Sequence, residues 1–85
     1  MEKYRIEIKK SAAKEIEHLP HRDIQAVLNK IRSLCKNPRP PGCKKLSGWE
    51  KYKIRCGDYR ILYSMEDHIL IIYIVQVGQR KDVYR

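Results

Sequence analysis

Phenylalanine is absent from this sequence of 85 residues, and tryptophan occurs once. Aliphatic side chains must therefore supply most of the core, together with six tyrosines. Long hydrophobic runs are missing too, because the longest uncharged apolar stretch, residues 69–77, is too short to span a membrane as a helix. The start, Met1-Glu2-Lys3-Tyr4-Arg5, is charged and unlike a signal peptide. We expect one domain over residues 1–85, cytoplasmic and without a membrane anchor.

Cysteine is scarce as well. Cys35, Cys43 and Cys56 cannot all pair within one chain, and none stands at Cys-x-x-Cys spacing. The pattern argues against a disulfide framework or a structural zinc site and is typical of reduced cytosolic cysteines. No pair of histidines or carboxylates marks a histidine-based or metal-dependent nuclease either. We therefore expect no metal ion and no organic cofactor.

Positive charge, in contrast, is abundant. The chain carries 19 Lys and Arg against 10 Asp and Glu, a formal net charge of +9 and a pI near 9.7. The excess is concentrated in residues 39–60, which hold seven basic residues but only Glu50 and Asp58 as acids. Such a cluster predicts binding to a polyanion and is typical of a nucleic-acid footprint.

The apolar pattern predicts an α+β fold of order β-α-α-β-β-β. Alternation over residues 4–8 indicates a strand, and 3.6-residue periodicity indicates helices near 12–19 and 24–35, separated by Pro20, with Ser11 as an N-cap. Residues 38–43 are irregular, and 44–46 can form a short edge strand. Strands follow at 52–56, 59–63 and 68–77, the last one central because it is apolar throughout. We expect a small antiparallel sheet with the N-terminal helical hairpin on one face.

Gly57-Asp58 predicts a two-residue hairpin turn of type II′. This turn places Arg55 opposite Arg60 and sends Lys53, Arg55 and Arg60 to the face away from the helices. Each cation alone is better explained as a solvated side chain. Three of them on one face, with like charges opposed, favour an anion site, for which RNA or DNA phosphate is the obvious ligand.

These residues resemble a known family. Tyr52-Lys53-Ile54-Arg55, Gly57-Asp58-Tyr59-Arg60-Ile61-Leu62-Tyr63 and Val77-Gly78-Gln79-Arg80 with a late Tyr84 are similar to the RelE toxins of toxin–antitoxin pairs. The likeness covers essentially the whole chain and implies a RelE-like fold. Gly-Asp-Tyr-Arg alone marks the wider superfamily, which includes ParE toxins directed at DNA gyrase. The set of Lys53, Arg55, Arg60, Arg80 and Tyr84 is more specific to RelE.

The resemblance implies a metal-independent mRNA interferase that cleaves mRNA in the A site of the 70S ribosome, with a RelB-like antitoxin as its protein partner. Lys53 would be the general base, and the positive charges of Arg55 and Arg60 disfavour its protonated form. Arg60 would hold the phosphate, Arg80 would act at the leaving oxygen, and Tyr84 would stack on a nucleotide. We expect further RNA contacts from Lys44, Lys45, Lys51 and Lys81.

Two departures from the RelE pattern stand out. Arg55 occupies a position where the RelE member compared carries lysine, and arginine is a poor base. The chain also ends one residue after Tyr84, so the segment beyond Arg80 is short. The alternative hypothesis is a protein without catalysis on the same fold, either a ParE-like gyrase inhibitor or a basic RNA-binding module.

Overall fold

The computed structural model describes residues 4–46 and 51–79. Within these ranges the chain forms two helices and five strands. In chain order they are β1 (Arg5–Ile8), α1 (Lys10–Glu17), α2 (His21–Ser33), β2 (Lys44–Lys45), β3 (Lys51–Cys56), β4 (Tyr59–Glu66) and β5 (Ile71–Gln79). Neither helix in this part of the chain is long and apolar enough to cross a membrane.

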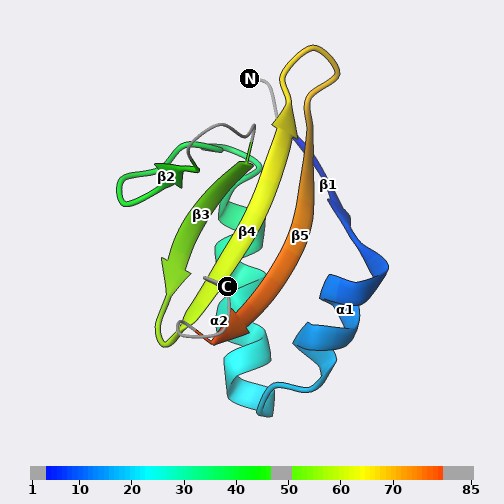
Figure 1. Ribbon diagram of the computed structural model, residues 1–85, viewed down its shortest axis with the longest axis vertical. Helices are drawn as coiled ribbons and strands as arrows, with labels where there is room; N and C mark the ends of the chain where they lie inside the picture. The colour runs from blue at the N-terminus through cyan, green and yellow to red at the C-terminus, as the bar shows by residue number, and fades with distance from the viewer. Residues whose placement is uncertain (1–3, 47–50, 80–85) are drawn as a thin grey trace.

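The five strands form one sheet in the order β1-β5-β4-β3-β2, and both helices lie on one side of it (Figure 1). The predicted α+β class and the helical hairpin are confirmed. The strand that we expected at the centre, β5, is an interior strand between β1 and β4, and β4 is the middle strand. The sheet itself is mixed, whereas we expected it to be antiparallel throughout, because β1 runs parallel to β5. Parallel neighbours need a long crossover connection, and the helices together with the β2–β3–β4 meander provide it.

The helices bury one stripe each against the sheet. Ala12 and Ile16 of α1 are four residues apart and almost fully buried, as are Val27 and Ile31 of α2. Ser11 is not the N-cap that we predicted. The backbone N–H of Lys9 donates to the carbonyl of Ile74 (2.9 Å), and the helix already begins at Lys10, so Ser11 lies in its first turn.

Burial alternates along the strands as a half-covered sheet requires. In β4 every second residue is buried, and the core side chains of β3, β4 and β5 face the helices. Those of lowest exposure are Ile54, Ile61, Tyr63, Ile72, Ile74 and Val77. Ile71, at the start of β5, is buried although it lies on the same face as Tyr73. Because residues 69–75 are apolar, we also expected all of them to be core, and this expectation is wrong. Ile69 lies in the β4–β5 turn with 61% exposure, and Tyr73 alternates to the outer face with 37% exposure.

Candidate active site on the outer face of the sheet

The β3–β4 hairpin has the predicted register. Cys56 pairs with Tyr59, Arg55 with Arg60, and Lys53 with Leu62. Gly57 has a φ of 60°. Among the described non-glycine residues Leu70 alone has a positive φ, so the φ of Asp58 is negative. A positive φ at the first turn position alone fits type II′, because type I′ needs it at both. The turn thereby fixes which side chains share a face.

Lys53, Arg55 and Arg60 project from the outer face, opposite the helices. Their strand neighbours Ile54 and Ile61 are 3% and 0% exposed on the inner face, so a shift of one residue would bury charges. Lys53 and Arg60 are half-buried, whereas Arg55 is exposed and donates from Nε to the carbonyl of Gly57 (3.3 Å). Because paired residues lie side by side, the side chains of Arg55 and Arg60 leave the sheet next to each other.

Two of the lysines predicted to bind RNA extend this face. Lys44 of β2 pairs directly with Lys53, and Lys51 lies two residues before Lys53 on the same side of β3. We call Lys44, Lys51, Lys53, Arg55 and Arg60 the cationic face. Lys45 pairs with Tyr52 and therefore lies on the helix side at the sheet edge. Arg80, Lys81 and Tyr84 lie outside the described residues.

The inner side of the same two strands is held by tyrosines. The hydroxyl of Tyr59 donates to Asp23 Oδ2 on α2 (2.7 Å), and this hydrogen bond raises the pKa of Tyr59. Tyr63 is fully buried, and its hydroxyl donates to the carbonyl of Pro38 (2.7 Å). Burial strongly raises the pKa of Tyr63. These bonds connect β4 to α2 and to the loop before β2, so the backbone that carries the outer cations is anchored from behind.

Tyr52 completes this anchor. Its ring stacks on Tyr63 with centroids 5.8 Å apart, and the guanidinium of Arg39 lies 5.3 Å from its centroid. Arg39 also forms an ion pair with Asp67 (3.1 Å), whose other carboxylate oxygen accepts from the Tyr4 hydroxyl (2.7 Å). The two partners together lower the pKa of Asp67, the Tyr4 hydrogen bond most. Arg39 is thus engaged in structure, although it belongs to the basic segment.

Chemically, the cationic face can bind an oxyanion and stabilise charge that develops on it. Arginine forks bind phosphate oxygens in pairs, and a lysine beside them can accept a proton once it is neutral. In residues 4–46 and 51–79 no group of three His, Cys, Asp or Glu side chains is placed to hold a metal ion. The groups that the cationic face presents are lysine ammonium and arginine guanidinium groups.

Sequence reasoning missed the neighbouring part of the outer face. Tyr73, Ser64 and Lys9 line an open hollow together with Lys51 of the cationic face. Tyr73 belongs to an apolar run in the sequence, but alternation with the buried Ile72 and Ile74 places its side chain on the outer face. The same alternation places Val75 outward, and a β-bulge turns the following Gln76 to this face as well.

Comparison with known proteins identifies relatives that share this fold. A family model described as the ParE toxin of type II toxin–antitoxin systems matches residues 6–84. A RelE-like toxin protein of Escherichia coli is 33% identical over 86 residues, covering 96% of this chain and 90% of that protein. A chain of the archaeal RelE–RelB complex from Pyrococcus horikoshii OT3 has a TM-score of 0.84 at 29% identity, over 94% of this chain and 98% of that one.

The isolated RelE toxin of Escherichia coli has a TM-score of 0.79 at 25% identity, over 95% of this chain and 90% of that one. The family model and the curated relative both span nearly the entire sequence, and the solved structures share its helical hairpin and sheet. The chain belongs to the RelE/ParE family and is a RelE-like toxin of a type II toxin–antitoxin pair.

Proposed function

We propose that this toxin is a metal-independent endoribonuclease that cleaves mRNA in the ribosomal A site. The observation that carries the proposal is the convergence of Lys53, Arg55 and Arg60 on one side of the β3–β4 hairpin. The two arginines lie directly opposite each other on neighbouring strands. Such opposition of like charges destabilises the hairpin, and an anion bound between the two side chains would offset the repulsion.

The reaction is an internal attack of the ribose 2′-oxygen on the adjacent phosphorus. The bond from O2′ to phosphorus forms and the bond from phosphorus to O5′ breaks, which leaves a 2′,3′-cyclic phosphate and a 5′-hydroxyl. Lys53, in its neutral form, takes the proton of the 2′-hydroxyl. Arg60 holds the phosphoryl oxygens as their charge grows, and Arg55 adds positive charge beside it.

Arg80 and Tyr84, from the segment outside the described residues, complete the proposed set. Arg80 supplies a proton to O5′ or stabilises the charge on that oxygen, and Tyr84 stacks on a nucleotide. Lys44, Lys51 and Lys81 contact the RNA backbone. Lys45 lies on the helix side of the sheet edge, so it would contact only RNA that extends past the cationic face. The ribosome would supply the substrate geometry that brings the 2′-oxygen in line.

The partner that we propose is a RelB-like antitoxin in the cytoplasm. The solved relatives include RelE chains in complex with RelB. With a net charge of +9, this chain favours an antitoxin with an acidic or amphipathic helix that covers the cationic face. Such a cover would block RNA and stabilise a small toxin at the same time.

The test is primer extension on mRNA incubated with 70S ribosomes. We expect discrete cuts in A-site codons from the wild type, and a loss of about 10²–10⁴-fold in the Lys53→Ala variant, the range for removal of a general base. Lys36→Ala removes an exposed lysine in the turn after α2, outside this hairpin, and should cut like the wild type. No cuts from folded wild-type protein, together with inhibition of DNA gyrase supercoiling, would replace the proposal with the ParE-like alternative.

A further inference from the structure

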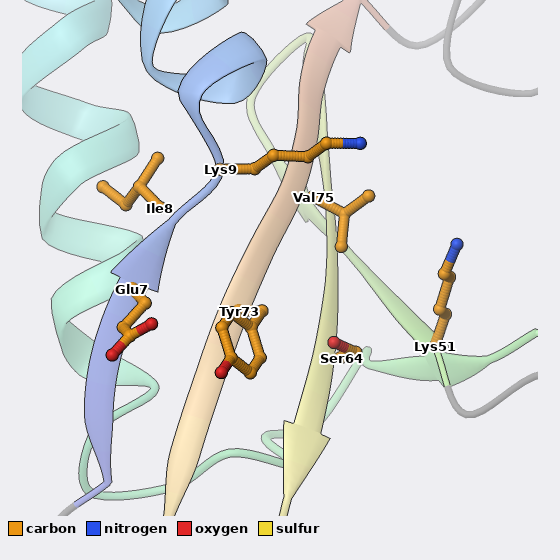
Figure 2. A pocket seen from close by; sticks show the side chains of 7 residues that line it. All are labelled: Glu7, Ile8, Lys9, Lys51, Ser64, Tyr73 and Val75. Carbon is orange, nitrogen blue, oxygen red and sulfur yellow. The ribbon is translucent and has the colours of Figure 1, made fainter.

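A second feature of the outer face lies beside the cationic face. An open hollow of about 510 Å³ is lined by Glu7, Ile8 and Lys9 from the β1 end, by Tyr73 and Val75 of β5, and by Ser64 and Lys51. Figure 2 shows the Tyr73 ring between Glu7 and Ser64, with Val75 further along β5 and the Lys9 side chain extending across that strand. The Ile8 side chain points to the other side of β1. The ring and Val75 thus form the apolar floor.

The strand register builds this hollow as a row. Glu7 pairs with Tyr73, Tyr73 with Ser64, and Ser64 with Lys51, so one line of outward side chains crosses four strands. The row runs from a carboxylate through an aromatic ring and a hydroxyl to an ammonium group. Lys51 is followed on the same face by Lys53, about 6.5 Å further along β3 at the usual rise per residue. The hollow is therefore continuous with the cationic face.

A β-bulge lies beside the floor of the hollow. The pairing of β4 with β5 shifts between Leu62 and Tyr63, so that Leu62 faces Gln76 and Tyr63 faces Ile74, and Val75 is the extra residue. Ile74 and Val77 are buried, while Val75 and Gln76 between them are both half-exposed. A bulge adds an unpaired residue and often re-aims side chains beside functional sites. Val75 lies on the outer face two residues after Tyr73, and the bulge turns Gln76 to that face as well.

We propose that this hollow is a binding subsite for one base of single-stranded RNA, flanking the phosphate at the cationic face. Tyr73 offers a ring with 37% exposure on which a base can stack, and stacking on aromatic side chains is how proteins hold unpaired bases. Lys51 and Lys9 flank the ring and attract the adjoining phosphates. The inference rests on the proposed function, because it assigns part of the substrate to a surface beside the same cations.

Glu7 gives the subsite a base preference. A carboxylate accepts hydrogen bonds from amino groups, which adenine, cytosine and guanine carry. Uracil offers only its N3–H, which lies between two carbonyl oxygens that a carboxylate repels. Glu7 now interacts with Arg5 at 3.6 Å across an exposed surface, which leaves its second carboxylate oxygen available to a base. The subsite should therefore disfavour uracil, and Glu7→Gln should weaken that preference.

The test uses fluorescence anisotropy with a short, labelled 2′-O-methyl RNA, which cannot be cleaved because its 2′-oxygens are blocked. Tyr73→Ala should weaken binding at least about fivefold, the lower end for loss of one stacked base. Tyr73→Phe should bind like the wild type because it keeps the ring. Ile69→Ala, which truncates another exposed apolar side chain in the β4–β5 turn, is the matched control and should also have no effect.

A series of abasic RNAs makes the test independent of folding. One abasic position should weaken binding to the wild type and have no further effect on Tyr73→Ala. Equal affinity of Tyr73→Ala and the wild type would overturn the subsite, as would loss of antitoxin binding alone, which would assign the hollow to the protein partner. Tyr73-dependent binding without ribosomal cleavage would contradict the proposed function and leave the subsite standing. If Tyr73→Ala left both cleavage and RNA binding unchanged, the subsite would be contradicted and the proposed function would stand.

Discussion

Arg55 and Arg60 are cross-strand partners with the same charge, and this predicts that neutralising one of them stabilises the fold. Like charges at directly opposed positions destabilise a sheet, by an amount similar to the roughly 0.2–1 kcal/mol that favourable pairs contribute. Arg55 is exposed, so solvent screens part of the repulsion, and we expect about 0.5 kcal/mol. Its hydrogen bond to the Gly57 carbonyl is long, at 3.3 Å, and in water offsets little of this.

The variant is Arg55→Gln, which keeps a polar side chain and removes the charge. Its free energy of unfolding in urea should rise by about 0.5 kcal/mol, which corresponds to about 2–4 °C in Tm for a domain of this size. The gain should shrink as salt is added, because the Debye length falls to about 8 Å near physiological ionic strength. RNA cleavage should fall in the same variant, since one cation of the site is gone.

Lys36→Gln is the matched control. It removes one charge from the same net +9, but from an exposed position in the turn after α2. General relief of the net charge would stabilise both variants equally, whereas cross-strand repulsion stabilises Arg55→Gln more. Equal stabilities, or a loss of stability in Arg55→Gln that does not depend on salt, would refute the reasoning.

Three further predictions concern the scaffold. Tyr63→Phe should lower the free energy of unfolding by about 1–3 kcal/mol in urea titrations, because the Pro38 carbonyl loses its buried donor. Gly57→Ala should lower it by about 1–2 kcal/mol through left-handed strain alone, since no atom beyond the two adjoining residues lies within 4 Å of the added Cβ; an unchanged Tm would contradict this. The Tyr4 hydroxyl and Arg39 lower the pKa of Asp67, so its contribution to stability is complete above the unfolded value near 3.9 and is lost as pH falls through the lower folded pKa. Acid titration of Asp67→Asn should lack this component, and an identical acid limb in both proteins would refute it.

The β3–β4 hairpin was predictable because two independent signals agreed. Gly57-Asp58 gave the turn type, and the alternation of isoleucines and cations gave the register, so the outward direction of Lys53 and Arg60 followed from sequence. The interior position of β5 followed from its apolar run for a similar reason. Both faces of an interior strand tend to be apolar, and the sequence of β5 reflects that.

The parallel pairing of β1 and the hollow around Tyr73 could not be predicted in the same way. Which strand β1 joins depends on where the helical hairpin, with Ala12 and Ile16 buried against the sheet, returns the chain. The alternation within β1 does not encode that. The bulge at Val75 arises from a register shift between β4 and β5. Its trace in the sequence is the pair Val75-Gln76, which breaks the alternation. Ser11 showed that a good capping residue does not fix a helix start when a neighbouring strand already binds the preceding N–H.

The most direct measurement of the central claim is cleavage of ribosome-bound mRNA that carries a single 2′-deoxy nucleotide at the mapped cut site. Attack by the 2′-oxygen, promoted by Lys53 and Arg60, predicts that this cut disappears while cuts at unmodified codons persist, and that the remaining fragments end in a 2′,3′-cyclic phosphate. Cleavage at the deoxy position with undiminished rate would contradict the account, because the nucleophile would then come from outside the RNA.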